Sequence, residues 1–278
     1  MMPTSTTAPQ VTVESLARRQ RNQRLLDLLA EITHRALLAP SGRAAREVLA
    51  EWGFPETSVG HLDVGYFPDP AFVAWELQRR GVLTSEAEGA AVLSPTWSGR
   101  VVGPWRSPRG RILTFFAWAP ESADRDGRYV FGPGSRPPAL FSQDRPAARR
   151  SGHLWLVEGL LDVLLAVWLG MEDVAGMGGP FWLLSVQVLA QLAASGIRQL
   201  TLMPADDEEG RRDVLTVLQN ADRVTRPAVD VFVVDPAMMA GARDLGELAQ
   251  RRATQVLTGV EAWRMEGNVY RVAMVPLQ

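Results

Sequence analysis

Two apolar runs that each end in acidic residues constrain this chain more than any other feature. The first run, His153–Val157, is followed directly by Glu158 and, one helical turn on, by Asp162. The second run, Ile197–Met203, is followed by four consecutive acids at 206–209. A short apolar run bounded by turn residues is typical of a buried strand. The pattern therefore predicts an open α/β sheet with carboxylates at the carboxyl ends of two strands.

Carboxylates gathered at such a sheet edge are the ligands that hard divalent cations prefer. On this interpretation the metal ligands are Glu158, Asp162, Asp206 and Asp207, and Glu208 can substitute for one of them. A plainer interpretation stays open for both sites. Acids are favoured in the first turn of a helix by the helix dipole, so both groups can simply begin the helices that follow the strands.

Composition limits the classes of protein that this chain can belong to. Its 278 residues are 46% hydrophobic, enough for a large core and for two domains. It has no cysteine, which excludes disulfides, thiolate metal sites and cysteine nucleophiles, and a cytoplasmic location is expected. The most apolar segment, Leu154–Gly170, is interrupted by two acids, so we expect no membrane span. No lysine occurs either, so chemistry that needs a catalytic lysine is excluded.

The small net charge of −2 hides a division along the chain. Residues 98–152 contain ten arginines and four acids, whereas residues 153–247 contain six arginines and fourteen acids. A basic surface beside an acidic one fits a polyanion held next to bound cations. Ordinary solvated loops and helices would give the same counts, so the charges alone leave both interpretations open.

Hydrophobic periodicity predicts a helical first part, then a hairpin, then alternating strands and helices. Before residue 150 we predict helices over 13–38, 43–52, 70–80 and 85–93, strands over 62–67 and 129–131, and a hairpin over 99–118. After it we predict strands near 153–157, 173–176, 198–203 and 229–234, and helices near 160–169, 180–195, 209–219 and 244–262. Such alternation predicts a mostly parallel sheet covered by helices on both faces.

The acidic motifs resemble those of the Toprim domain of bacterial-type replicative DNA primases. Val157–Asp162 is similar to the first acidic motif, and Leu202–Gly210 to the second, which is normally Asp-x-Asp, two residues and Gly. Three other stretches, Arg100–Phe115, Pro137–Ser142 and Arg243–Leu248, are similar in the same order to the primase segments that flank this sheet. The resemblance implies a Toprim-like, mostly parallel sheet flanked by helices and preceded by a mixed α+β primase-type subdomain.

The resemblance also implies a division of the chain and a partner set. We expect a disordered tail at 1–13, a basic N-terminal subdomain at 14–150, a Toprim-like domain at 151–263 and a C-terminal strand or tail at 264–278. The implied partners are single-stranded DNA, nucleoside triphosphates and a replicative helicase acting in trans. The implied cofactor is Mg²⁺ or Mn²⁺. We expect no zinc, because the cysteine-rich zinc module that precedes this core in primases has no counterpart in the sequence.

By the same resemblance, Glu158, Asp162 and Asp207 are the catalytic acids that hold the metal, with Asp206 as a further ligand. Four arginines would contact the phosphates of template or nucleotide: Arg100, Arg109, Arg111 and Arg136.

The sequence also departs from the family pattern. When the second motif is aligned on Gly210, the first aspartate of Asp-x-Asp falls on Ala205 and only the second, Asp207, remains. Pro138 stands where the family has a lysine, and Ser107 where the hairpin turn usually has an aspartate.

Three functions fit these residues. The first is metal-dependent nucleotidyl transfer that makes short RNA primers on single-stranded DNA. The second is a catalytically degenerate Toprim protein that binds nucleic acid or a partner in replication, which Ala205 and Pro138 favour. The third is a Toprim nuclease, against which the primase-like hairpin argues.

Overall fold

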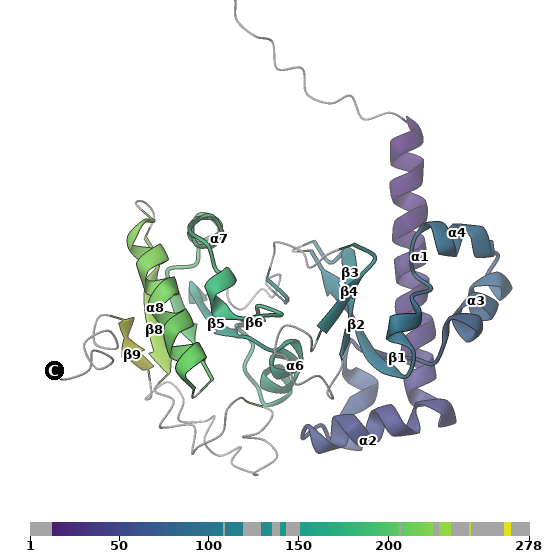
Figure 1. The fold of residues 1–278 in the computed structure, drawn as a ribbon, viewed down its shortest axis with the longest axis horizontal. Helices are drawn as coiled ribbons and strands as arrows, with labels where there is room; N and C mark the ends of the chain where they lie inside the picture. Colours follow the sequence, from purple (N-terminus) through teal and green to yellow (C-terminus); the bar gives the residue numbers. More distant parts are fainter. Residues whose placement is uncertain are drawn as a thin grey trace, which may run out of the picture.

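The computed structural model describes most of the chain between residues 13 and 267. The described ranges are 13–107, 109–118, 129–134, 140–142, 151–205, 207–224, 228–234, 245 and 264–267. Within these ranges the chain forms two sheets, each covered by helices (Figure 1). None of the described helices is long and apolar enough to cross a membrane.

The first sheet is antiparallel and has four strands in the order β1-β2-β3-β4. Its strands are β1 (Gly65–Phe67), β2 (Arg100–Arg106), β3 (Ile112–Trp118) and β4 (Tyr129–Gly132). The expected hairpin at 99–118 is confirmed: β2 and β3 pair along their length, and Gly110, with φ of 77°, lets the backbone turn between them. The expected strand at 62–67 is shorter than predicted, because only its last three residues pair with β2.

Four helices precede or flank this sheet. They are α1 (Val13–Leu38), α2 (Arg43–Glu51), α3 (Pro70–Arg79) and α4 (Thr84–Gly89). Helix α1 has the predicted limits, and its buried leucines form one core with α3, α4 and one face of the sheet. Asp69 begins α3 by accepting a hydrogen bond from the Phe72 amide at 2.8 Å.

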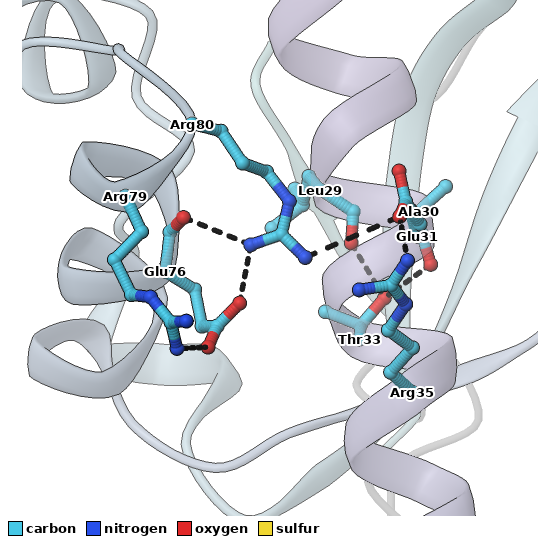
Figure 2. Close-up of polar contacts among 8 residues, drawn as sticks. All are labelled: Leu29, Ala30, Glu31, Thr33, Arg35, Glu76, Arg79 and Arg80. Carbon is cyan, nitrogen blue, oxygen red and sulfur yellow. Dashed lines mark hydrogen bonds and ion pairs between the residues drawn. The ribbon is translucent and has the colours of Figure 1, made fainter.

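Arginine side chains fasten α3 to α1 (Figure 2). Arg80 donates to the carbonyl and the carboxylate of Glu76 and also lies 4.0 Å from the carboxylate of Glu31 on α1. Glu31 pairs in turn with Arg35 one turn later. Arg80 is the least exposed arginine of this group, with 19% of its side-chain surface exposed, so the ion pair with Glu76 is better shielded from solvent than an ordinary surface pair.

The second sheet has five strands in the order β6-β5-β7-β8-β9, and its first four are parallel. The strands are β5 (His153–Val157), β6 (Val174–Gly176), β7 (Gln199–Leu202), β8 (Asp230–Val234) and β9 (Arg264–Glu266). β9 runs antiparallel to β8 at the edge. The predicted mostly parallel sheet after a mixed N-terminal part is therefore confirmed.

Helices cover both faces of the second sheet. They are α6 (Leu160–Trp168), α7 (Val186–Ala194) and α8 (Glu208–Asp222). Alternate residues of β5 enter different cores: Trp155 packs with α6 and the first sheet, while Leu156 packs with α7 and α8. The helix predicted at 180–195 is divided, because Ser185 caps a new helix at the Val188 amide. The helix predicted at 244–262 lies outside the described residues apart from the buried Leu245.

Aromatic residues join the two sheets. Trp105 of β2 is fully buried and lies 5.7 Å from Phe131 and 5.6 Å from Phe141, between ring centroids. A Cβ atom on Gly178, just beyond β6, would lie 2.9 Å from the Trp105 ring. The tryptophans at 97, 105 and 118 are all buried, so packing, not base stacking, is their role.

Candidate functional site

The two acidic strand ends lie at one edge of the second sheet. β5 and β7 are parallel neighbours, and the amide of Met203 donates to the carbonyl of Leu156 at 3.0 Å. Glu158 follows β5 directly, and Asp207 lies beyond the end of β7. Carboxyl ends of adjacent parallel strands are where open α/β sheets place their ligand sites.

Glu158 is fixed by its backbone. Its carbonyl accepts a hydrogen bond from the amide of Gly178 at 2.9 Å and a longer one from Gly179 at 3.4 Å. The amides of the glycine turn after β6 thus bind the backbone carbonyl of Glu158, which is a structural role. The Glu158 side chain is half-buried, and its Oε1 atom is shielded from solvent.

The side chain of Tyr129 caps the start of α6, the helix that follows Glu158. Its hydroxyl oxygen accepts hydrogen bonds from the amides of Leu160 at 2.9 Å and Leu161 at 3.4 Å. These amides have no carbonyl partner within α6, because they lie in its first turn. No local sequence signal predicts this role, because Tyr129 lies in a strand of the other sheet and its hydroxyl caps a helix far along the chain.

Asp162 is buried, with 6% of its surface exposed, and its carboxylate lies directly over Gly159. A side chain at position 159 would overlap the Oδ2 atom of Asp162. Gly159 has an ordinary φ of −79°, so the glycine is required here for space and not for backbone freedom.

We therefore expect Gly159→Ala to destabilise the protein by about 1–3 kcal/mol, because the added methyl group must displace a buried carboxylate. Thermal unfolding measures the loss. Gly170→Ala is a poor control because of its positive φ, whereas Gly89→Ala adds a methyl group in open space at an ordinary φ and should change little. Equal stabilities of Gly159→Ala and the unaltered protein would contradict this placement of Asp162.

At the second strand end, Asp207 caps helix α8. Its Oδ1 atom accepts a hydrogen bond from the Gly210 amide at 2.7 Å. Ala205 is buried, with 6% exposed, and packs against Gly210, where any Cβ atom would meet the Ala205 backbone. Glu208 is exposed and pairs with Arg212 at 2.9 Å. The helix-start interpretation therefore holds for Asp207 and Glu208, while Asp206 lies outside the described residues.

No three histidine, aspartate or glutamate side chains among the described residues lie close enough together to enclose a metal ion. Magnesium in nucleotide-handling sites is usually held by one or two carboxylates and completes its shell with water and substrate phosphates. Glu158 and Asp207 supply one carboxylate from each of two adjacent strand ends, so the donor set fits a magnesium or manganese ion of that open kind.

The predicted basic residues do not all lie together. Arg100 begins β2, where it is half-buried. Arg109 and Arg111 are exposed at the hairpin turn, and Arg111 donates to Gln23 of α1 at 3.3 Å. Arg136 lies outside the described residues. A further arginine, Arg106, donates two hydrogen bonds to the carboxylate of Asp63 near the turn of the hairpin.

Two of the three histidines have structural hydrogen bonds. His34 contacts the carbonyl of Val64 at 2.8 Å. The His153 ring lies between the hydroxyl of Thr201 at 2.9 Å and the carboxylate of Asp173 at 3.2 Å, and thereby links three strand segments of the second sheet.

Comparison with known proteins identifies the fold. No family model matches the chain. A DNA primase of Listeria monocytogenes is 28% identical over 228 residues, which are 74% of this chain and 35% of the relative, and one of Listeria innocua is 28% identical over 87% of this chain and 42% of the relative. The chain thus spans well under half the length of these curated relatives.

Solved structures agree. The RNA polymerase domain of Mycobacterium tuberculosis primase DnaG matches with a TM-score of 0.73 at 20% identity, covering 93% of this chain and 88% of that one. A DnaG primase catalytic domain bound to ssDNA matches with a TM-score of 0.71 at 17% identity, covering 93% and 83%. The chain therefore has the fold of bacterial primase catalytic cores, and the expected resemblance is confirmed.

Proposed function

We propose that this chain is a primase-type nucleotidyltransferase core that binds single-stranded DNA and joins nucleoside triphosphates into short RNA primers. One observation carries the proposal: Glu158 and Asp207 follow adjacent parallel strands in a primase-core fold that extends over nearly the whole chain. The ssDNA-bound primase domain among the similar structures supports single-stranded DNA as the template.

In this proposal Glu158 and Asp207 hold Mg²⁺ or Mn²⁺, with Asp206 and Asp162 as further ligands. The ion, when bound, neutralises charge on the phosphoryl group that is transferred. Primer synthesis would take place in the cytoplasm, beside a replicative helicase acting in trans.

The chain's own residues orient the reactants. The amide of Gly178 fixes the backbone at Glu158, and the hydroxyl of Tyr129 fixes the start of α6, so the backbone that carries the first carboxylate is in place before substrate arrives. We assign phosphate contacts to Arg100, Arg109 and Arg111, and to Arg136 beyond the described residues. Arginine suits this role, because its guanidinium group can donate two parallel hydrogen bonds to a phosphate.

A second candidate is a degenerate relative that binds DNA without making primers. Ala205 favours it: the side chain is a buried methyl group where the family has a metal-ligating aspartate. Asp207 favours it too, because one of its oxygens is engaged at Gly210.

Primer synthesis on a single-stranded template, with all four nucleoside triphosphates and Mg²⁺ or Mn²⁺, separates the two candidates. Labelled RNA products resolved on a denaturing gel are expected under the first. Absence of product from a protein that still binds the template would contradict the first candidate and support the second.

Ala205→Asp tests whether the second strand end faces the metal. In EDTA we expect the variant to lose about 1–3 kcal/mol of stability, because a carboxylate is buried without a partner. Mg²⁺ should restore most of that loss, since an ion that binds only the folded state stabilises it. Ala205→Asn is the matched control, of the same size but uncharged. An equal response of both variants to Mg²⁺ in thermal unfolding would place the ion elsewhere.

A further inference from the structure

The face of α1 that packs on the protein changes character along the helix. Leu25 and Leu29 are buried against the first sheet. Seven residues make nearly two helical turns, so the positions above them on the same face are Arg18 and Asn22. Both are exposed, and here the upper turns of α1 rise past the ends of the neighbouring strands (Figure 1). A packing face thus continues as a basic, polar face.

This polar face forms one wall of a cleft of about 490 Å³. The hairpin end of β3 and the turn after β4 form other parts of its lining. The residues that define it here are Arg19, Asn22, Gln23, Arg111, Leu113 and Pro133. Leu113 is 43% exposed, which leaves an apolar surface beside the charged groups. We call these six residues, together with Arg18, the α1 cleft.

The α1 cleft has two arginines in its described lining. Arg19 on α1 and Arg111 just before β3 line the same cleft, and no aspartate or glutamate is among the described residues that line it. Asp27 lies beside it on α1 and accepts a hydrogen bond from Gln23 at 3.1 Å. Arg111 contacts the neutral amide of Gln23 at 3.3 Å. Cations facing one another across a cleft repel, and an anion between them removes that repulsion.

The α1 cleft is separate from the sheet edge that holds Glu158. α1 packs on the face of the first sheet formed by Val102, Phe115 and Ala117. The opposite face, with Trp105 and Phe116, packs toward α6 and the second sheet. Figure 1 shows the first sheet lying between α1 and the second sheet. A ligand in the α1 cleft therefore occupies another side of the molecule.

We propose that the α1 cleft is a second binding surface for single-stranded nucleic acid, which grips the phosphate backbone away from the sheet edge. Arg18 and Arg19 supply phosphate contacts beside Arg111, and the amide of Asn22 supplies further hydrogen bonds. Basic grooves of this kind follow the backbone of a single strand without reading its sequence. The choice of DNA as the polyanion rests on the proposed function. The charge and shape of the cleft are observed independently of that function.

A combined Arg18→Gln and Arg19→Gln variant tests the α1 cleft, and Arg111 is kept because the proposed function already assigns it a phosphate contact. Binding of fluorescein-labelled oligothymidylate is followed by fluorescence anisotropy in EDTA, without nucleotides, over a series of salt concentrations. We expect at least about fivefold weaker binding, and a salt slope lower by about 1.4, since each of the two phosphate contacts on a single strand contributes roughly 0.7. Arg24 stays unaltered because it donates to the Arg80 carbonyl.

The matched control removes two exposed arginines elsewhere, Arg35 and Arg43, each of which pairs with a glutamate of its own helix. Circular dichroism checks that both variants fold. Equal affinity and salt slope for cleft variant and control would overturn the proposal. Competition by polyglutamate as effective as that by oligothymidylate, at equal charge, would overturn the assignment to nucleic acid.

The outcome is independent of catalysis. The α1 cleft should bind DNA even if the protein makes no primers. If the unaltered protein makes no primers but the cleft variant binds DNA more weakly, only the proposed function is contradicted. If the unaltered protein makes primers and the cleft variant binds DNA as tightly as it does, only the cleft proposal is contradicted.

Discussion

Glu158→Gln is expected to reduce primer synthesis at least about hundredfold while the protein remains folded. The substitution keeps the size of the side chain and removes the charge that would attract the metal; loss of a group that stabilises developing charge commonly costs two to three orders of magnitude. The backbone at this position is held by Gly178 and does not depend on the side chain, so the fold should survive.

The measurement is the initial rate of labelled primer formation at saturating Mg²⁺. Glu172→Gln is the control, because Glu172 is an exposed acid in the turn before β6. Template binding by anisotropy should be the same for both variants. If the Glu158→Gln protein makes primers as fast as the Glu172→Gln protein, Glu158 is not a catalytic residue.

Trp105→Ala is expected to cost about 3–5 kcal/mol of folding free energy, the largest stability effect that we predict for a single side chain. The indole ring is fully buried, contacts Phe131 and Phe141 edge-on, and lies against Gly178. Removing it leaves a cavity between the two sheets.

Urea unfolding monitored by circular dichroism measures this loss. Trp182→Ala is the matched control, since half of its surface is exposed, and it should cost far less. Because Gly178 also holds the Glu158 carbonyl, the cavity should loosen the candidate site as well. A Trp105→Ala protein as stable as Trp182→Ala would mean that the two sheets do not depend on this contact.

Local patterns in the sequence predicted most of the described elements, and tertiary context explains the differences. Helix α1 has the predicted limits, and its buried residues from Leu25 to Leu37 recur at helical spacing. β1 is shorter than its apolar run, since a strand extends only as far as its partner, and β2 pairs with just Gly65–Phe67. The helix predicted at 180–195 begins only at Val186, because the Ser185 side chain accepts a hydrogen bond from the Val188 amide and caps α7 there.

The candidate site was predictable only in part. Glu158 and Asp207 could be placed at the carboxyl ends of two strands on one edge of a sheet, because alternating strands and helices imply a parallel sheet. The order β6-β5-β7-β8 could not be predicted, since it depends on pairings between distant segments. Tyr129 could not be predicted for the same reason, because its hydroxyl acts on a helix 31 residues further along the chain. The domain boundaries at 150 and 263, and the four arginine contacts, stay predictions.

The hydrogen bond between Tyr129 and Leu160 has a further consequence. It crosses from an edge strand of the antiparallel sheet to the first turn of a helix that covers the parallel one, so it links the two halves of the molecule at the acidic edge. The Leu160 amide can exchange its proton with solvent only when that bond opens. The rate of deuterium uptake at the Leu160 amide therefore reports how often this contact between the two halves opens.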